Sequence, residues 1–272
     1  MTPIYRFTPG TTPVLISVPH AGTFIPDALR ARMTPAALDL PDTDWHVDTL
    51  YGFAPKLGVG LLTATHSRYV IDLNRDSAGK PLYPGADNTE LCPLSTFHRD
   101  RVYRAGEEPG QAEIAQRVVT YWQPYHDKLA SELAALRQRF GVAVLWDGHS
   151  IASEVPRFFE GRLPDFNLGS AKGASADATL TAEALRVLEG AKDYSTVLNG
   201  RFTGGFITRR HGQPAQGIHA LQLEMAQIAY MDEQPPYPLA PDRARRLQSV
   251  LEDCVAALVA WAKTQATTKV GA

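Results

Sequence analysis

The feature of the sequence that most constrains its fold is an apolar run that breaks abruptly into small polar residues. Val142 to Trp146 is continuously apolar, and the polar sequence Asp147-Gly148-His149-Ser150 follows it directly. Such a run is typical of a strand buried on both faces of a parallel sheet. Because open α/β sheets bind ligands at the carboxyl ends of their strands, His149 falls where a site is expected. The stretch alone leaves open a structural reading, in which Asp147 and Ser150 cap a turn.

A second stretch repeats this pattern near the N-terminus. Thr12 to Val18 predicts a buried strand, and Pro19-His20-Ala21-Gly22 follows it. Neighbouring parallel strands lie only about 5 Å apart. Two histidines at the ends of two such strands therefore favour a shared site over two structural histidines.

The composition predicts one globular domain spanning residues 1–272, with 44% hydrophobic residues and a formal charge of −2. This charge balance gives no reason to expect nucleic acid or an anionic membrane as a partner. No 18-residue apolar run and no secretory signal are found, so no membrane partner is expected. Cys92 and Cys254 are far apart and belong to no CxxC motif, which favours a reducing, cytoplasmic environment.

Strands and helices alternate along the predicted chain, which indicates an α/β fold with a mostly parallel sheet covered on both faces. Strands are predicted over 12–18, 61–65, 68–73, 142–146, 195–199 and 218–225. Helices are predicted over 26–33, in the segment that follows Asp48 and ends at about Leu57, over 111–140 with a kink at Pro124, over 177–189 and over 242–263. The segments 77–110 and 151–176 are irregular, and 77–110 is long enough to suggest a functional loop or a lid.

Several chemically active side chains fall at or near the predicted strand ends. They are His20, His149, the acidic residues Asp42, Asp44 and Asp48, the pair Asn74 and Arg75, and Glu224. Two imidazoles and one carboxylate form a common catalytic zinc shell that leaves a position for water. A further carboxylate is needed to move protons, and an arginine can bind a substrate carboxylate with two hydrogen bonds. This set of groups predicts metal-assisted hydrolysis of an anionic amide.

Most of these groups also have a structural interpretation. At least one of the aspartates before the predicted helix is expected to cap it, and Asp72 can pair with Arg68 or Arg75. Glu224 is the exception, because a carboxylate on an apolar strand is costly to bury unless it is paired. The remaining histidines are divided: we expect His66, His98, His126 and His211 at the surface, and leave His46 and His219 open.

Taken together, these motifs resemble the N-formylglutamate amidohydrolase family. The resemblance covers nearly the whole chain and rests on the segments 17–22, 42–45, 67–75, 146–150 and 199–202. That family is similar to the zinc carboxypeptidases and to the aspartoacylase and succinylglutamate desuccinylase group. The resemblance therefore implies a three-layer α/β fold, with a mixed, largely parallel sheet, helices on both faces and one divalent metal, zinc.

The resemblance also implies roles for individual residues. His20 resembles the first metal ligand, His149 the last, Asn74-Arg75 the pair for a substrate carboxylate, and Glu224 the general base. The related enzymes carry a glutamate three residues after the first histidine, whereas Thr23 stands there in this chain. Another acid must then complete the metal shell, for which we choose Asp44, with Asp48 as the second choice.

We therefore expect a metal-dependent enzyme that converts N-formyl-L-glutamate to formate and L-glutamate, the last step of histidine breakdown in the family. Arg68 is expected to stabilise the oxyanion, and Arg201 or Arg209 to bind the second carboxylate. The first alternative is a deacylase or carboxypeptidase acting on another acyl-amino acid. The second is a non-catalytic anion-binding protein on the same scaffold. The sequence leaves the oligomeric state open.

Overall fold

The structure is a computed structural model that describes residues 2–82, 85 and 87–268, and its centre is a mixed seven-stranded sheet. The strand order is β1-β3-β2-β4-β7-β5-β6. The central strands β3, β2, β4 and β7 are parallel, whereas β1 and β5 each pair antiparallel with a neighbour. The strands span Tyr5–Thr8 (β1), Val14–Val18 (β2), Gly60–Ala64 (β3), Ala143–Ile151 (β4), Phe166–Gly169 (β5), Thr196–Leu198 (β6) and Ile218–Ala226 (β7).

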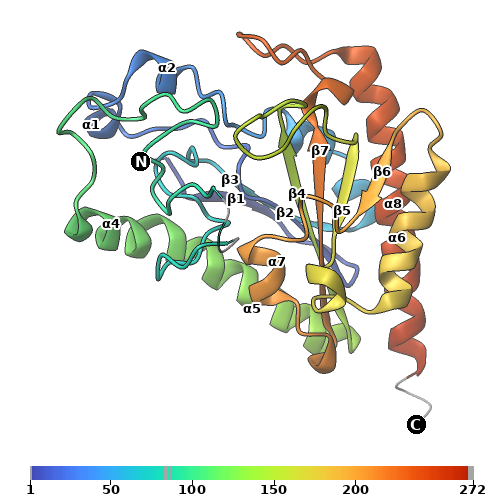
Figure 1. Cartoon of the computed structure of the whole chain (residues 1–272). Helices are drawn as coiled ribbons and strands as arrows, with labels where there is room; N and C mark the ends of the chain where they lie inside the picture. The colour runs from blue at the N-terminus through green and yellow to red at the C-terminus, as the bar shows by residue number, and fades with distance from the viewer. Residues whose placement is uncertain (1, 83–84, 86, 269–272) are drawn as a thin grey trace.

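Helices cover both faces of the sheet, as Figure 1 shows, so the predicted three-layer α/β fold is confirmed. The α-helices span Asp27–Arg30 (α1), Pro35–Leu38 (α2), Val47–Leu50 (α3), Gln111–Arg117 (α4), Gln123–Phe140 (α5), Ala178–Gly190 (α6), Phe206–His211 (α7) and Pro241–Thr268 (α8). A π-helical turn, Val118–Trp122, joins α4 to α5, and short 3₁₀ turns lie at Ala54–Leu57, Ala171–Gly173, Pro214–Gln216 and Gln227–Ala229.

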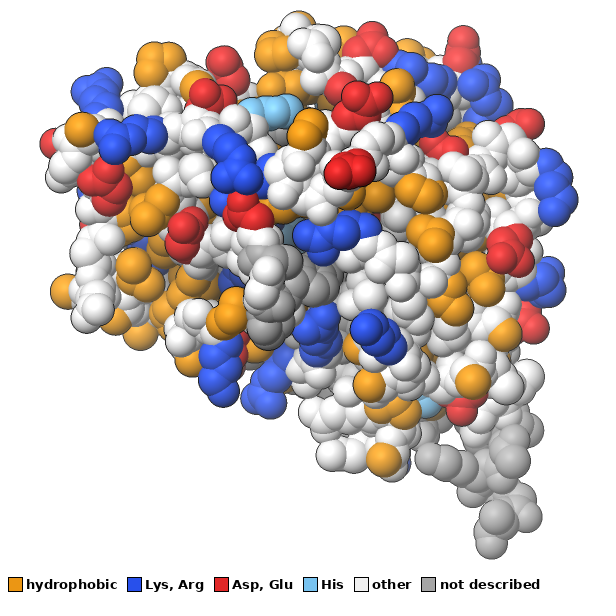
Figure 2. Space-filling view, in the orientation of Figure 1, with side chains coloured by type: hydrophobic (Ala, Val, Ile, Leu, Met, Phe, Trp, Pro, Cys, Tyr) orange, Lys and Arg blue, Asp and Glu red, His pale blue; other side chains and the backbone are white. Residues whose placement is uncertain are grey.

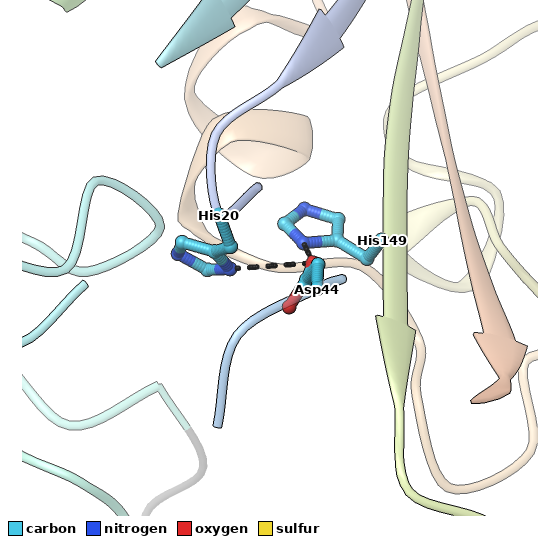
Figure 3. Close-up of side chains that lie close together, drawn as sticks. All are labelled: His20, Asp44 and His149. Atoms are coloured by element: carbon cyan, nitrogen blue, oxygen red, sulfur yellow. Dashed lines mark hydrogen bonds and ion pairs between the residues drawn. The ribbon is translucent and has the colours of Figure 1, made fainter. Parts of the chain in front are cut away.

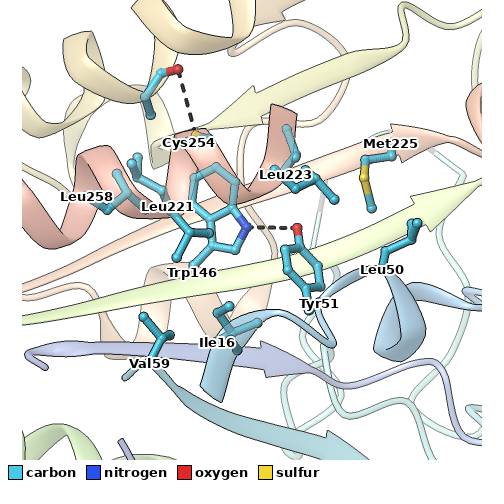
Figure 4. Packing of buried hydrophobic residues seen from close by; sticks show 14 of the residues in the cluster. Ile16, Leu50, Tyr51, Val59, Trp146, Leu221, Leu223, Met225, Cys254 and Leu258 are labelled. Atoms are coloured by element: carbon cyan, nitrogen blue, oxygen red, sulfur yellow. Dashed lines mark hydrogen bonds between the residues drawn. The ribbon is translucent and has the colours of Figure 1, made fainter. Parts of the chain in front are cut away.

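The two-residue periodicity of the strands divides the core between the two layers of helices. Val14 and Ile16 of β2 pack with α8 on one face, whereas Leu15 packs with α5 on the other. Figure 4 shows the first of these clusters, in which the Trp146 Nε1 donates a 2.8 Å hydrogen bond to the hydroxyl of Tyr51. Within the described residues, no helix combines the length and apolar content needed to cross a membrane.

Strand β4 differs from the prediction in its length. The expected break after Trp146 is wrong, because β4 continues to Ile151 and each of its residues pairs with β7. The polar residues therefore belong to the strand itself. Gly148 is required here, since a Cβ at this position would lie 2.5 Å from the ring of Tyr51.

Residues 68–73 were expected to form a strand, and this prediction is wrong. The segment is a buried turn in which side chains bind nearby backbone amides: Ser67 accepts from Tyr69, and Asp72 accepts from Asn74. Such local bonds compete with a strand ladder. The apolar residues Val70 and Ile71 that suggested a strand are buried, but against the N-terminal helices and α5.

Other boundaries were also missed. Strand β1 and helix α7 were not predicted, and β5 lies inside the segment 151–176 that we expected to be irregular. The expected kink at Pro124 corresponds to the π-helical turn just before it, with Pro124 in the first turn of α5. Of the segment 77–110, residues 83, 84 and 86 lie outside the described residues. His66, His126 and His211 are buried, contrary to prediction, whereas His98 is exposed.

Candidate metal and catalytic site

The parallel pairing of β2, β4 and β7 brings the predicted site residues together at one end of the sheet. Glu224 of β7 stands directly opposite His149 of β4 in the strand register. On the other side, Ser17 of β2 is paired with Asp147 of β4, so His20 follows β2 next to His149. The rings of the two histidines have centroids 4.9 Å apart.

Asp44 joins the two histidines from the loop that follows α2. Its backbone N–H donates to the carbonyl of His20, which fixes this loop beside the end of β2. The Asp44 Oδ2 lies 3.1 Å from His149 Nδ1 and 3.7 Å from His20 Nδ1. One ligand atom from each residue lies within 4.8 Å of the others, and Figure 3 shows the three side chains pointing toward one point. All three side chains are buried.

The residues fit a divalent metal such as zinc. Two imidazole nitrogens and a carboxylate are ordinary zinc ligands. The second carboxylate oxygen, Asp44 Oδ1, is buried and has no hydrogen-bond partner among the residues that the structure describes. Its contact with Arg68 Nη1, at 3.8 Å, is too long for a hydrogen bond. A buried carboxylate oxygen without a hydrogen bond is costly, and a metal cation would lower that cost. Asp48, the second choice for this ligand, instead pairs with Arg6 at 2.8 Å and is partly exposed.

Two further carboxylates orient the histidines from behind. Asp72 lies 2.8 Å from His20 Nε2, and Asp147 lies 3.0 Å from His149 Nε2. A carboxylate accepts a hydrogen bond, so Asp72 favours a proton on Nε2 of His20 and Asp147 favours one on Nε2 of His149. With those protons in place, each Nδ1 would be the ligand atom for a bound metal. From the sequence, Asp147 was expected only to cap a turn and Asp72 only to pair with an arginine. The distance of Asp72 from His20 along the sequence contained no signal of their contact.

Burial and charge act against each other in this cluster. Burial disfavours the charged form of His149, but the carboxylates of Asp147 and Asp44 outweigh it and raise the pKa of His149 well above its usual value. Burial disfavours the charged form of Asp44 as well, yet His20 and His149 hold the pKa of this carboxyl well below its usual range. The site is therefore built around an ionised Asp44.

Glu224 has the opposite electrostatic environment. Burial, aided by the negative charge of Asp44 and opposed by His149, raises the pKa of Glu224 to about 8. One carboxylate oxygen, Oε2, accepts a 3.2 Å hydrogen bond from the side-chain amide of Gln222. A carboxyl group with a pKa near neutrality is suited to accept and return a proton.

A cavity opens beside these groups and is lined by His20, Asp44, His149 and Glu224. Arg68, Asn74 and Arg75 contribute polar groups to its wall. The apolar part of the wall is formed by Leu82, Phe97, Ile151, Phe158 and Phe202. Figure 2 shows blue lysine and arginine side chains around the centre of the face that it presents. The cavity therefore combines a candidate metal site, a candidate base and cationic groups for an anion.

The polar wall is held by a network around Asp72. Arg68 Nη2 donates to Asp72 Oδ2 at 2.6 Å, and Arg75 Nη1 lies 3.7 Å from the same oxygen. The Arg68 Nε is buried without a hydrogen-bond partner among the described residues, so it remains able to donate. The Asn74 Nδ2 lies 3.2 Å from His149 Nε2. Asp72 was expected to pair with Arg68 or Arg75, and it contacts both.

Two predicted substrate residues lie farther out. The Arg201 Nε donates to the carbonyl of Phe158 at 2.6 Å. Arg209 donates to the carbonyl of Leu82 and lines two neighbouring cavities. Neither arginine is among the described residues that line the cavity at Glu224. Arg201 contacts Phe158 and Arg209 contacts Leu82, two residues that line the cavity at Glu224. The roles of both arginines in substrate binding remain predictions.

Comparison with known proteins places this site in a family. The model of the N-formylglutamate amidohydrolase family matches residues 12–231. An N-formylglutamate deformylase of Pseudomonas aeruginosa is 48% identical, covering 97% of this chain and 98% of the relative. One of Pseudomonas putida is 47% identical, covering 96% and 97%.

Solved structures agree with this comparison. The crystal structure of an N-formylglutamate amidohydrolase of Ralstonia eutropha JMP134 has a TM-score of 0.77 and 26% identity, covering 96% of this chain and 97% of that one. A protein of Agrobacterium tumefaciens, with a TM-score of 0.70 and 19% identity over 96% of this chain and 95% of its own, shows the same fold. With a family model that matches most of its length and relatives near half identity, this chain belongs to the N-formylglutamate amidohydrolase family.

Proposed function

We propose that this protein hydrolyses N-formyl-L-glutamate to formate and L-glutamate, with His20, Asp44 and His149 holding one divalent metal ion, zinc. The observation that carries the proposal is the convergence of three buried ligand atoms beside the candidate base Glu224, with Asp44 Oδ1 accepting no hydrogen bond from the described residues. The relatives named N-formylglutamate deformylase support the substrate. The predicted place of the reaction in histidine breakdown follows from that substrate.

When bound, the metal would lower the pKa of a water molecule and polarise the formyl carbonyl. Glu224 accepts a proton from the attacking water, whose oxygen forms the new bond to the formyl carbon. The carbon–nitrogen bond then breaks, and Glu224 returns the proton to the leaving amine. Burial raises the pKa of Glu224 toward neutrality, which suits a group that both accepts and returns a proton. The products, formate and L-glutamate, account for all atoms of the substrate and the water.

The cationic wall supplies the remaining groups. Arg68 lines the cavity, and we propose that its guanidinium stabilises the oxyanion that develops on the formyl oxygen. Asn74 and Arg75 bind one carboxylate of the substrate, because an arginine fork can donate two hydrogen bonds to a carboxylate. Arg201 or Arg209 serves the second carboxylate. A cytoplasmic location, the lack of a nucleic-acid partner and a lid function for residues 77–110 stay predictions.

The competing function is deacylation of another acyl-amino acid with the same groups, and the apolar residues of the cavity wall bear on it. Phe97, Phe158 and Phe202 line the cavity, and we propose that these rings leave room only for the smallest acyl group, formyl. We would measure L-glutamate release from N-formyl-, N-acetyl- and N-succinyl-L-glutamate with the metal-loaded protein. We expect the formyl substrate to have the highest kcat/KM. Preference for a larger acyl group would replace the proposed substrate, and release from none of them would remove the proposed activity.

A further inference from the structure

Three buried aromatic side chains that the proposed reaction does not use lie directly behind the substrate-binding pair. They are Trp122, at the end of the π-helical turn, His126 in α5 and His211 at the end of α7. All three are less than 9% exposed. They face the segment 73–75, which contains Asn74 and Arg75.

Trp122 and His126 bind the backbone on either side of Asn74. The Trp122 Nε1 donates to the carbonyl of Arg75 at 3.0 Å, and the His126 Nε2 lies 2.8 Å from the carbonyl of Leu73. A carbonyl oxygen can only accept, so His126 carries its proton on Nε2. The residue between these two anchors, Asn74, is thereby fixed from both sides.

His211 extends the same network to α7. The neutral His126 ring has an acceptor at Nδ1, and His211 Nε2 lies 3.2 Å from it, so His211 donates to His126. The other end of α7 binds Asn74 itself, because the backbone N–H of Ile207 donates to Asn74 Oδ1 at 2.8 Å. This bond turns the Asn74 Nδ2 toward the cavity and His149.

The spacing of Trp122 and His126 explains why both anchors face the same way. Residues four apart lie on one face of a helix, so the two side chains point to the same side. Trp122 ends the π-helical turn, a kind of turn that is frequent at functional sites, and the rings of Trp122 and His126 stack with centroids 3.8 Å apart. The stacked pair presents its two N–H donors to the carbonyls of Arg75 and Leu73.

We propose that Trp122, His126 and His211 are positioning residues that hold Asn74 and Arg75 in the geometry needed to bind a substrate carboxylate. The proposal rests on the proposed function for the identity of the substrate. Loss of one of these bonds is expected to loosen the segment 73–75 and to weaken substrate binding, while Glu224 and the candidate metal ligands remain in place. If these three side chains only packed the core, their loss would lower the stability of the protein without a selective effect on KM.

The first variant is Trp122→Phe, which keeps the aromatic ring and removes only the N–H donor. The matched control is Trp261→Phe, because the indole of this buried tryptophan in α8 donates to Thr179 Oγ1, on the face of the sheet opposite α5. We expect Trp122→Phe to raise KM for N-formyl-L-glutamate about 3- to 10-fold, the range of one lost hydrogen bond, with kcat within about twofold. Trp261→Phe should leave both constants unchanged.

A double-mutant cycle then shows whether the effect passes through the binding pair. If Trp122 acts through Arg75, Trp122→Phe adds little to the KM of the Arg75→Ala variant. An equal, additive increase in both backgrounds would overturn the proposal. His126 offers a conservative rescue: His126→Gln retains a donor for the Leu73 carbonyl, so it should raise KM less than His126→Leu. Equal increases would contradict the role of that bond.

Backbone hydrogen exchange provides a readout that needs no substrate. The amides of Asn74, Arg75 and Ile207 are all hydrogen-bonded in this network. We expect Trp122→Phe to accelerate exchange in the peptides that contain residues 73–76, and Trp261→Phe to leave them unchanged. Unchanged exchange in Trp122→Phe would overturn the proposal even if formate release is confirmed. Faster exchange in a protein that fails to cleave N-formyl-L-glutamate would instead reject only the proposed substrate.

Discussion

The two halves of the β4–β7 pair are equally buried but differ in chemistry. In the first half, Val144 and Trp146 of β4 lie beside Leu221 of β7 in an apolar cluster against α8. In the second half, His149 stands opposite Glu224, and both point to the cavity. The ladder between the strands is continuous through both halves. The change from an apolar core to a polar site therefore lies in the side chains alone.

The difference shows where this fold is stabilised and where it is specialised. Apolar burial contributes about 25 cal/mol per Å², so the first half stabilises the sheet. The second half buries carboxylates and imidazoles whose desolvation is costly unless each finds a partner. Asp72 and Asp147 provide such partners for the histidines, but Asp44 Oδ1 accepts no hydrogen bond from the described residues and has only a 3.8 Å ion-pair contact with Arg68 Nη1. The polar half is thus arranged for a ligand rather than for stability.

The largest expected effect is a loss of activity when the polar half is changed. Glu224→Gln keeps the size of the side chain and removes the base, so kcat for formate release should fall by about 10²- to 10⁴-fold. The melting temperature and the metal content should stay close to those of the unmodified protein. Turnover near the normal rate would remove Glu224 from the mechanism.

The apolar half should respond in the opposite way. Leu221→Ala leaves a cavity under α8 and is expected to lower the free energy of unfolding by about 2–5 kcal/mol, measured by denaturant titration. The kcat/KM of the folded fraction should be nearly unchanged. A selective loss of kcat in this variant, without a loss of stability, would break the proposed division between the halves.

Arg75→Ala tests substrate binding at the polar half. Loss of a charged hydrogen-bond donor should raise KM about 10- to 100-fold with a smaller change in kcat. Arg139→Ala, at an exposed position of α5, is the control for loss of one positive charge. Equal KM values in the two variants would exclude Arg75 as a carboxylate ligand.

The smallest effect concerns His126 and His211, a buried pair that is neutral rather than charged. Burial lowers the pKa of His126 to about 3, with the charges of His211 and Arg210 acting in the same direction and the Leu73 carbonyl opposing them. Burial also lowers the pKa of His211 to about 4. The negative charge of Asp147 opposes this shift, and the positive charge of Arg210 adds to it. An unfolded histidine titrates near 6.5.

These lowered values favour the folded protein above pH 6.5, and this contribution is lost as the pH falls toward 3–4. Stability of the unmodified protein should therefore decrease between pH 6.5 and 4.5. His126→Gln should reduce that slope by up to about 1.4 kcal/mol per pH unit, measured by denaturant titration at each pH. The same slope in both proteins would show that His126 is not buried in its neutral form.

The sequence predicted the residues that lie near strand ends better than the contacts made between loops. His20 and His149 converge as expected, because parallel strands bring successive strand ends to one edge, and Asp44 joins them from the loop after α2. The orienting role of Asp72 was missed because its partner, His20, comes from another segment, and that of Asp147 because β4 was expected to end before it. The segment 68–73 reads as a strand by its apolar residues, and only the local bonds of Ser67 and Asp72 make it a turn.

His126 shows a further limit of the sequence. It was expected at the surface, but it is buried, stacked on Trp122 and hydrogen-bonded to His211 of α7, an element that was not predicted. The backbone carbonyl that it contacts, that of Leu73, carries no side-chain signal at all. Pairings between loops and helix interiors therefore required the three-dimensional structure.

The central claim is that the polar half holds a metal needed for amide hydrolysis. The most direct measurement is formate release from N-formyl-L-glutamate by the purified protein, after chelation and after titration with Zn²⁺, with metal content measured in parallel. We predict about one metal per chain, loss of activity on chelation and recovery at one equivalent, and failure of Asp44→Asn to bind zinc tightly. Full activity in the metal-free protein would contradict the claim and leave His20 and His149 as proton-transfer residues.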